Sequence, residues 1–287
     1  MTWTALGLVL AAAVFHAVWN SAAKGARGDG YVFVWAYATG SALLCLPPAV
    51  VQFVAAGAPW SWRLLVGPLV AGILHNIYGL VLQTGYRRAE LGVVYPVARG
   101  VGPLLTMVVA LAVLGEEPGA WGIAGGAVVL VGILVVATGS AQVRRDRLAT
   151  GVFYGAATGV AIASYTLWDN HAVTAWSLHP LTYFALSCSV QAVVLTPGAL
   201  RRRRHWAPTL RPNRGRIALV AVLSPAAYIL VLIAMQTTPV AIVAPVRESS
   251  IVIGSLLAWW LYREPDPARR VAGAAVVVCG IAFIAVG

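Results

Sequence analysis

Long apolar runs dominate the chain, and they restrict the folds open to it more than any other feature. A helix needs roughly 20 mostly apolar residues to cross a bilayer, and the chain offers ten such runs with few charges. Of the 287 residues, 60% are hydrophobic and 10% are charged, so almost none remain for a soluble domain. We therefore predict an all-α integral membrane protein with ten transmembrane helices. They cover 2–22, 31–55, 66–86, 91–114, 119–138, 150–172, 179–198, 216–236, 239–262 and 268–286.

Three features that could indicate other protein classes fit a membrane protein better. The run 2–22 lacks the basic start of a signal peptide and is longer than its apolar region, so we expect it to be retained as a helix. Cys45, Cys188 and Cys279 lie within expected helices, where a thiol behaves as a small apolar group, so no disulfide, metal site or cofactor is expected. The net charge of +11 comes from arginines in short loops, which favours contact with anionic lipid over nucleic acid.

The chain contains an internal repeat. YPVARGVGPLL at 95–105 has a counterpart, APVRESSIVIG, at 244–254, which places Pro96 and Pro245 at equivalent positions. Because each repeat holds five helices, an odd number, the second must enter the membrane from the opposite side. Inverted repeats of this kind are the architecture of secondary transporters, whose substrate sites lie near the midplane. The two predicted repeats are 1–140 and 149–287.

The distribution of positive charge predicts the orientation. Seventeen of the 20 Lys and Arg residues fall in the odd-numbered loops or in the first three residues of the helix that follows, whereas the second loop holds only Arg63. Cytoplasmic loops are enriched in Lys and Arg. We therefore expect a multi-pass plasma-membrane protein with odd-numbered loops in the cytoplasm and both termini outside.

Polar side chains recur at helical spacing in the first and sixth expected helices. His16, Asn20 and Lys24 are four residues apart and share one face, and Tyr165 and Asp169 have the same spacing. Asn20 and Lys24 also suit anchoring at the membrane interface. Asp169 fits a purely structural role less well, because an acid within a span requires a partner.

The third and eighth expected helices add His75, Tyr78 and Tyr228. Hydrogen bonds between helices would account for these residues without a function, so both interpretations stay open. His75 does not indicate a metal site, since no second histidine or carboxylate stands at ligand spacing on its helix.

The fourth and ninth expected helices carry charges deep in the membrane. Tyr95 and Arg99 share a face of one helix, and Arg247 and Glu248 follow Pro245 in the other. At ~1.5 Å per residue, each arginine lies about 12 Å inside its helix, near the midplane. A charge there costs at least ~2.5 kcal/mol, so it should face the interior and be paired. An ion pair that locks the repeats and a lined transport cavity both fit, and prolines that loosen helices at this depth favour the cavity.

Two further patterns indicate packing. Gly151, Gly155 and Gly159 form a stripe of small residues that permits close approach of another helix. Glu116, Glu117 and Glu264 are expected at helix starts, where a carboxylate suits the positive end of the helix dipole.

Four segments together resemble the EamA-type ten-helix members of the drug/metabolite transporter superfamily. The segments are FHAVWNSAAKG, YRRAELGVVYPVARGVGPLL, SYTLWDN and VRESSIVIGSLL, and the likeness extends over both halves. The resemblance implies a transporter of small metabolites, often an exporter, that works by alternating access without nucleotide hydrolysis.

The sequence thus predicts a secondary transporter rather than an enzyme. Arg99, paired with Glu248, can bind an anionic group bidentately, which suits an amino acid or another small carboxylate. Since no P-loop is present, coupling to protons through Glu248 or Asp169 is expected. The expected substrate-binding residues are His16, Asn20, His75, Tyr78, Tyr95, Arg99, Tyr165, Asp169, Tyr228, Arg247 and Glu248.

Other functions and partners remain open at this point. A lipid flippase would show a lateral opening and a channel an unbroken pore, whereas a membrane-embedded enzyme would need a catalytic constellation that the chain does not display. Membrane lipids and a small-molecule substrate are the expected partners. The protein is expected to be a monomer or a homodimer.

Overall fold

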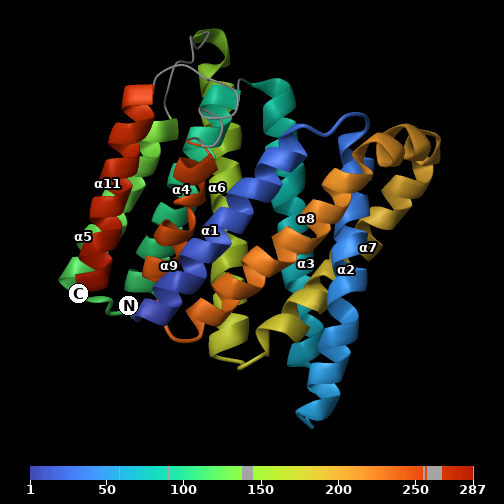
Figure 1. Ribbon diagram of the computed structural model, residues 1–287, viewed down its shortest axis with the longest axis horizontal. Helices are drawn as coiled ribbons and strands as arrows, with labels where there is room; N and C mark the ends of the chain where they lie inside the picture. The colour runs from blue at the N-terminus through green and yellow to red at the C-terminus, as the bar shows by residue number, and fades with distance from the viewer. Residues whose placement is uncertain (58, 90, 138–144, 255, 257–266, 287) are drawn as a thin grey trace.

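The computed structural model describes residues 1–287 except 58, 90, 138–144, 255, 257–266 and 287 (Figure 1). The expectations for the side chain of Lys24 and for Glu264 lie outside this description. All regular structure in the described residues is helical, as the sequence predicts. Each of the ten expected segments contains a described helix.

In the part of the chain that the structure describes, seven helices are long and apolar enough to cross a membrane. They are α1 (Trp3–Lys24), α2 (Gly30–Ala55), α3 (Arg63–Arg88), α4 (Leu91–Ala112), α6 (Arg145–Thr174), α7 (Pro180–Arg201) and α8 (Trp206–Met235). Three further helices complete the described bundle: α5 (Gly119–Ala137) and α11 (Pro267–Val286) are apolar and shorter, and α9 (Val240–Arg247) is the shortest. A 3₁₀ turn, η1 (Arg203–His205), joins α7 to α8.

Two helices begin earlier than the apolar pattern predicts. α6 starts at Arg145 and α8 at Trp206, whereas the apolar runs begin near 150 and 216. The added stretches are rich in arginine. A helix satisfies its own backbone hydrogen bonds outside the hydrocarbon as well as inside, so it continues past the point where hydropathy ends.

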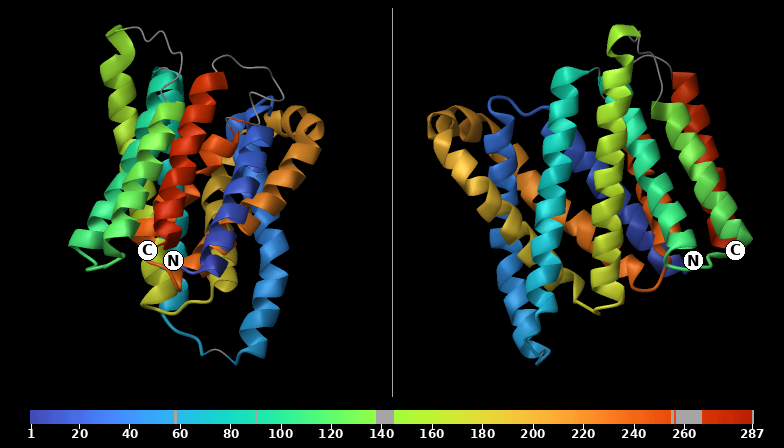
Figure 2. Two further views of the ribbon diagram at one scale, coloured as in Figure 1. Left: turned by 60° about the vertical axis from the view of Figure 1, so that its left-hand side comes forward. Right: turned by 180° about the vertical axis from the view of Figure 1, so that it is seen from behind.

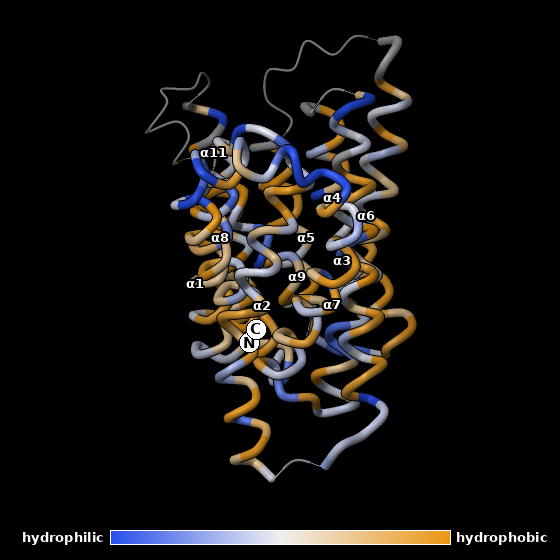
Figure 3. The backbone as a smooth tube through the Cα atoms, turned by 90° about the vertical axis from the view of Figure 1, so that its right-hand side faces the viewer, coloured by the Kyte–Doolittle hydropathy of each residue, from blue (hydrophilic) through white to orange (hydrophobic). Residues whose placement is uncertain are grey.

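Successive helices alternate in direction, and both termini lie at the same end of the bundle (Figures 1 and 2). The most hydrophilic stretches gather at the opposite end, where the α1–α2 and α7–α8 connections lie (Figure 3). We call these the terminal end and the basic end. Two of the basic loops expected on one side of the membrane thus lie at one end of the bundle, and the others fall partly outside the described residues.

Helices from the two halves of the chain pack against one another. α1 lies along α8 and α3 along α6, while α2 packs on both α7 and α8 and α3 packs also on α7. α4 contacts α6 and α9, and α5 pairs with α11 at one edge of the bundle (Figure 2). The core is therefore built mainly between the halves rather than within each.

The stripe of small residues on α6 brings α4 close. A Cβ at Gly151, Gly155 or Gly159 would lie 2.7–2.8 Å from the side chains of Val93, Val97 and Val101 respectively. Such distances are shorter than real contacts, so the glycines are required for this packing, as expected.

Polar contacts join the two halves at the basic end. The Asn213 amide donates to the Arg27 carbonyl at 2.7 Å and accepts from the Arg27 N–H at 3.2 Å. The Asp29 N–H donates to Thr209 Oγ1 at 3.0 Å. The connection between α1 and α2 is therefore fixed to the start of α8.

Replacing Gly155 with alanine should lower the free energy of unfolding by about 1–3 kcal/mol, because the new methyl group would overlap the rigid, β-branched Val97. Gly7→Ala is the matched control, since nothing lies within 4 Å of a Cβ at that position. Thermal or denaturant unfolding in detergent measures both. Equal stability of the two variants would contradict the packing described for α4 and α6.

Candidate functional site

Three charged side chains meet inside the bundle, where α4 contacts α9. Arg99 Nη1 donates to Glu248 Oε2 at 2.7 Å. On the other carboxylate oxygen, Oε1 accepts from Arg247 Nη2 at 3.1 Å and from its Nε at 3.3 Å. The pairing of Arg99 with Glu248 expected from the sequence is confirmed. We refer to Arg99, Arg247 and Glu248 as the charged triad.

A break in the ninth expected segment places two members of this triad. α9 ends at Arg247, Glu248 and Ser249 form a turn, and helical backbone resumes at Ser250. Pro245 has no N–H to offer, and the N–H groups of Glu248 and Ser249 bond three residues back, to Pro245 and Val246. By contrast α4 runs without interruption through Pro96. The loosening expected at both prolines is thus a break only in the second half.

The start of α9 is fixed by the first half of the chain. The two carboxylate oxygens of Glu116 accept the N–H groups of Val240 and Ala241, at 3.0 and 2.9 Å. These N–H groups belong to the first turn, which has no partners within its own helix. The role expected for Glu116 at a helix start is confirmed, and it holds the short helix that carries Arg247.

The charged triad carries a net charge of +1 in a buried place. The side chains of Arg99, Arg247 and Glu248 are only 10%, 7% and 1% exposed. Arg247 Nη1 is buried and has no hydrogen-bond partner among the described residues. Unpaired buried donors are costly, so this nitrogen offers a donor for which the described residues supply no acceptor.

Other polar groups surround the triad. His16 on α1 lies within electrostatic range of Arg99 and Glu248. Its Nε2 is buried without a partner in the described part of the chain, as is Ser249 Oγ. The Arg99 guanidinium lies 5.4 Å from the Tyr95 ring centroid. The site therefore combines cations, an aromatic ring and unpaired hydrogen-bonding groups.

A second polar cluster is centred on Asp169, which is fully buried. Tyr183 Oη donates to Asp169 Oδ1 at 2.5 Å, and Tyr228 Oη donates to Oδ2. His75 Nε2 lies 3.8 Å from Oδ2. The acid thus joins α3, α6, α7 and α8.

Tyr165 connects the two clusters. Its ring stacks on His75 at a centroid distance of 4.2 Å and lies 5.6 Å from the Tyr78 ring. The Arg247 guanidinium is 6.0 Å from the same Tyr165 ring. A movement of the Tyr165 ring would therefore change its contacts with His75 in one cluster and with Arg247 in the other.

Ten of the eleven residues expected at the site fall into these two clusters. The exception is Asn20, which lies one turn beyond His16 on α1 and makes no hydrogen bond or ring contact in the described residues. Tyr183 was missed by the sequence reasoning. In an antiparallel helix pair, residues at similar distances from the connecting turn lie at the same depth. Asp169 lies shortly before the α6–α7 connection and Tyr183 shortly after it, so this placement could have indicated the contact.

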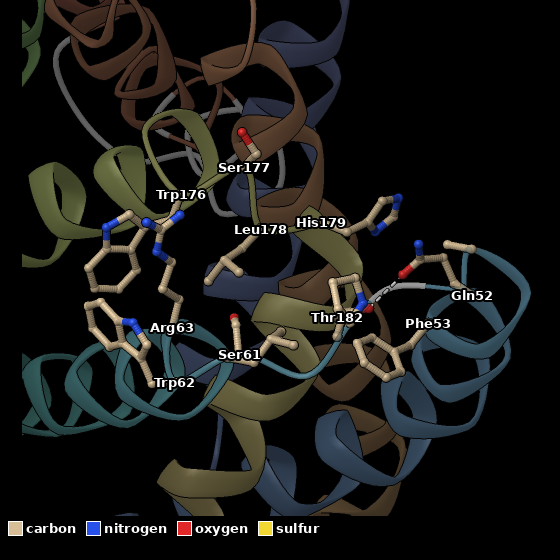
Figure 4. Close-up of a pocket in the computed structure, with 13 residues that line it drawn as sticks. Gln52, Phe53, Ser61, Trp62, Arg63, Trp176, Ser177, Leu178, His179 and Thr182 are labelled. Carbon is tan, nitrogen blue, oxygen red and sulfur yellow. Dashed lines mark hydrogen bonds between the residues drawn. The ribbon is translucent and has the colours of Figure 1, made fainter.

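A pocket of about 550 Å³ opens near the Asp169 cluster, at the connection between α6 and α7 and the start of α3 (Figure 4). Trp62, Trp176, Leu178 and Thr182 are among its lining residues. Thr182 Oγ1 donates to Gln52 Oε1 at 2.6 Å across it. Its place at the α2–α3 and α6–α7 connections puts it at the terminal end of the bundle.

Comparison with known proteins identifies the family. A profile described as the EamA-like transporter family matches residues 149–286. Two relatives, from Salmonella paratyphi C (strain RKS4594) and Salmonella choleraesuis (strain SC-B67), are each 35% identical over 101 residues, which are 34% of this chain and 80% of theirs. Both are named probable 4-amino-4-deoxy-L-arabinose-phosphoundecaprenol flippase subunit ArnE.

The chain belongs to the EamA-like transporter family. It is accordingly a membrane transporter, as its apolar helices and the resemblance of its motifs predict. One solved structure, described only as the crystal structure of a protein, covers 100% of this EamA-like chain with a TM-score of 0.75. The match takes in 98% of that structure at 16% sequence identity, so it shows a shared fold and no more.

Arg99→Ala and Glu248→Gln should be strongly coupled in a double-mutant cycle, because each removes a partner of the same buried ion pair. We expect a coupling energy of roughly 0.5–3 kcal/mol in the free energy of unfolding. Arg202→Ala with Asp29→Asn is the matched control, since that pair is 3.6 Å apart and Arg202 is 45% exposed. Additive effects at the triad would contradict the pairing.

Proposed function

We propose that the protein is a secondary transporter that exports small metabolites, such as amino acids or other small carboxylates, by alternating access. In this proposal ten membrane-crossing segments form two inverted five-helix repeats, with the charged triad between them. The odd-numbered loops lie in the cytoplasm and the protein resides in the plasma membrane.

The packing of the helices supports inverted halves. In two five-helix repeats α1 is equivalent to α6, α2 to α7, α3 to α8, α4 to α9 and α5 to α11. When each helix is exchanged for its equivalent, the α1–α8 contact becomes α6–α3 and the α2–α8 contact becomes α7–α3. All four of these contacts are present. The pairs α2–α7, α4–α9 and α5–α11 map onto themselves under the same exchange. The alternating helix directions give the two halves opposite entry sides (Figure 1).

The observation that carries the substrate class is the unpaired Nη1 of Arg247 within a triad of net charge +1. In a medium of low polarity an uncompensated cation favours an anion, and a guanidinium binds carboxylate or phosphate through parallel N–H donors. The helix break beside it follows the pattern of secondary transporters, in which interrupted helices present binding groups near the midplane.

A second candidate is transport of a lipid-linked anion, because the two relatives are named as flippase subunits. An apolar pocket of about 570 Å³ between α2 and α8, lined by residues that include Leu43, Leu44 and Arg214, could admit a lipid chain. Its lining places a cation beside apolar side chains, which suits an anionic lipid.

Counterflow in proteoliposomes against a panel of amino acids and small carboxylates tests the main proposal. Arg247→Gln should reduce counterflow of the transported compound at least tenfold, which corresponds to ~1.4 kcal/mol of binding free energy. Arg214→Gln is the matched control and should retain it. The main proposal would be wrong if no panel compound shows counterflow while a phosphate-bearing lipid moves between leaflets in a way that depends on Arg214. That result would favour a flippase instead.

The proposed orientation predicts the labelling of single cysteines in a variant without native cysteines. A cysteine at Arg204 should be protected from an impermeant maleimide added to intact cells, and one placed at the C-terminus should react. Seventeen basic residues lie in the odd-numbered loops or in the first three residues of the helix that follows, and such a bias favours a cytoplasmic position for those loops. Reaction of Arg204→Cys from outside would reverse the orientation.

A further inference from the structure

We propose that Asp169 and His75 together bind one exchangeable proton, and that this pair is the proton site of the transporter. The binding of the proton follows from the geometry of the cluster alone. The coupling of this proton to transport rests on the function proposed above. Of the two acids expected to carry the proton, the proposal selects Asp169 rather than Glu248.

The hydrogen bond on the far side of the imidazole determines which of its nitrogens faces the acid. His75 Nδ1 lies 2.9 Å from the Ala71 carbonyl oxygen. A carbonyl only accepts, so Nδ1 must carry a proton. In a neutral ring Nε2 then has only a lone pair, and this lone pair faces Asp169 Oδ2 across 3.8 Å.

An ionised Asp169 beside a neutral His75 would place two acceptors opposite each other. One proton on either atom removes this conflict, giving an imidazolium–carboxylate pair or a carboxylic acid that points to the imidazole. The contact is buried, with the two side chains 15% and 1% exposed, so water compensates little for the repulsion. The cluster therefore favours a state with one added proton.

Among the groups around Asp169, His75 is the one that can share the added proton with it. The tyrosines Tyr183 and Tyr228 already donate their hydroxyl protons to the carboxylate. Within the described residues no lysine or arginine forms an ion pair with it, although Arg247 lies within electrostatic range. The charged and titratable groups that face Asp169 are His75 from α3, Tyr183 from α7, Tyr228 from α8, Arg247 from α9 and Tyr165 one turn away on α6.

Glu248 is a weaker candidate for the proton. It binds Arg99 at 2.7 Å and Arg247 at 3.1 Å, and both guanidiniums are permanently charged. Taking up a proton there would leave two buried cations without a counter-ion, which is costly. Asp169 forms no ion pair with an arginine or lysine among the described residues, so its protonation does not remove the counter-ion of a paired cation.

The pocket at the terminal end supplies a route for the proton. Leu178, Thr182 and Trp176 line it. Tyr183 follows Thr182 in the chain, and its ring, Leu178 and Trp176 all lie within 4 Å of where a Cβ at Gly67 would be. Tyr183, whose hydroxyl binds Asp169, therefore lies next to residues that line the pocket.

Proton binding at this place can influence the substrate site. Asp169 joins helices of both halves, because His75 is on α3 while Tyr183 and Tyr228 are on α7 and α8. Tyr165 stacks on His75 and lies beside the Arg247 guanidinium. A change of protonation thus acts on the helices that must move and on the cation proposed to bind substrate.

The proton site can be tested in nanodiscs without any substrate. Infrared difference spectra and ¹⁵N-histidine NMR of the wild-type protein, recorded between about pH 5 and pH 8, report on carboxylic acid and imidazole protons. We expect a titrating signal that Asp169→Asn or His75→Gln removes and that Glu248→Gln retains, with His75 Nδ1 protonated throughout. A wild-type protein in which neither group changes over this range, or a His75 ring with an unprotonated Nδ1, would overturn the proposal.

A transport measurement then tests the coupling. In proteoliposomes at clamped voltage, a pH step should accumulate the counterflow substrate in the wild type but not in Asp169→Asn, whose thermal unfolding serves as the fold control. Accumulation that persists in Asp169→Asn would overturn the coupling. If no panel compound shows counterflow, the proposed function fails while the spectroscopic result on the proton still stands, so the two failures are distinguishable.

Discussion

The burial of three charges between the halves of the chain is the constraint on which the rest of the structure depends. An arginine within a membrane span is tolerated only where protein shields it and an acid compensates it. Here Glu248 meets two guanidiniums, and the helices that carry them must approach closely enough for bonds of 2.7 and 3.1 Å. Glu116 holds the start of α9, and glycines on α6 let α4 pack deeply. Each of these contacts serves to place the triad.

The two ends of the bundle differ in a way that matters for transport. At the basic end, side chains of α8 bind the backbone of the α1–α2 connection, so the halves are joined there. At the terminal end, a pocket enters beside Leu178 and Thr182. A transporter that alternates its access must exchange such an arrangement for the opposite one. Asp169 bonds to α7 and α8 and contacts α3, so under the proposed mechanism this cluster joins the helices that would have to move.

Most of the fold and most of the site could be predicted from the sequence, and the reasons are physical. Apolar runs must be helical in lipid, and buried charges must pair, so the helices and the Arg99–Glu248 bond follow from composition and depth. The early start of α8 could not be predicted from the sequence, because hydropathy does not distinguish a polar helix outside the hydrocarbon from a polar loop. The division into two clusters and the contact of Tyr183 with Asp169 depend on how helices rotate about their axes. Side-chain packing determines that rotation, and periodicity alone does not reveal it.

The repeat itself explains why the central pair consists of opposite charges. Pro96 and Pro245 are 149 residues apart, and at the same offset Arg99 corresponds to Glu248 and Ala98 to Arg247. If the halves are inverted repeats as proposed above, equivalent positions beside their pseudo-two-fold axis meet each other, just as residues on the axis of a symmetric dimer meet their own copies. Identical charges at that position would repel within the membrane, whereas Arg99 and Glu248 attract. Arg247 has only an alanine as its counterpart, so the surplus positive charge arises where the two halves have diverged. On this argument symmetry supplies the structural ion pair, and the departure from symmetry supplies the cation available for an anionic substrate.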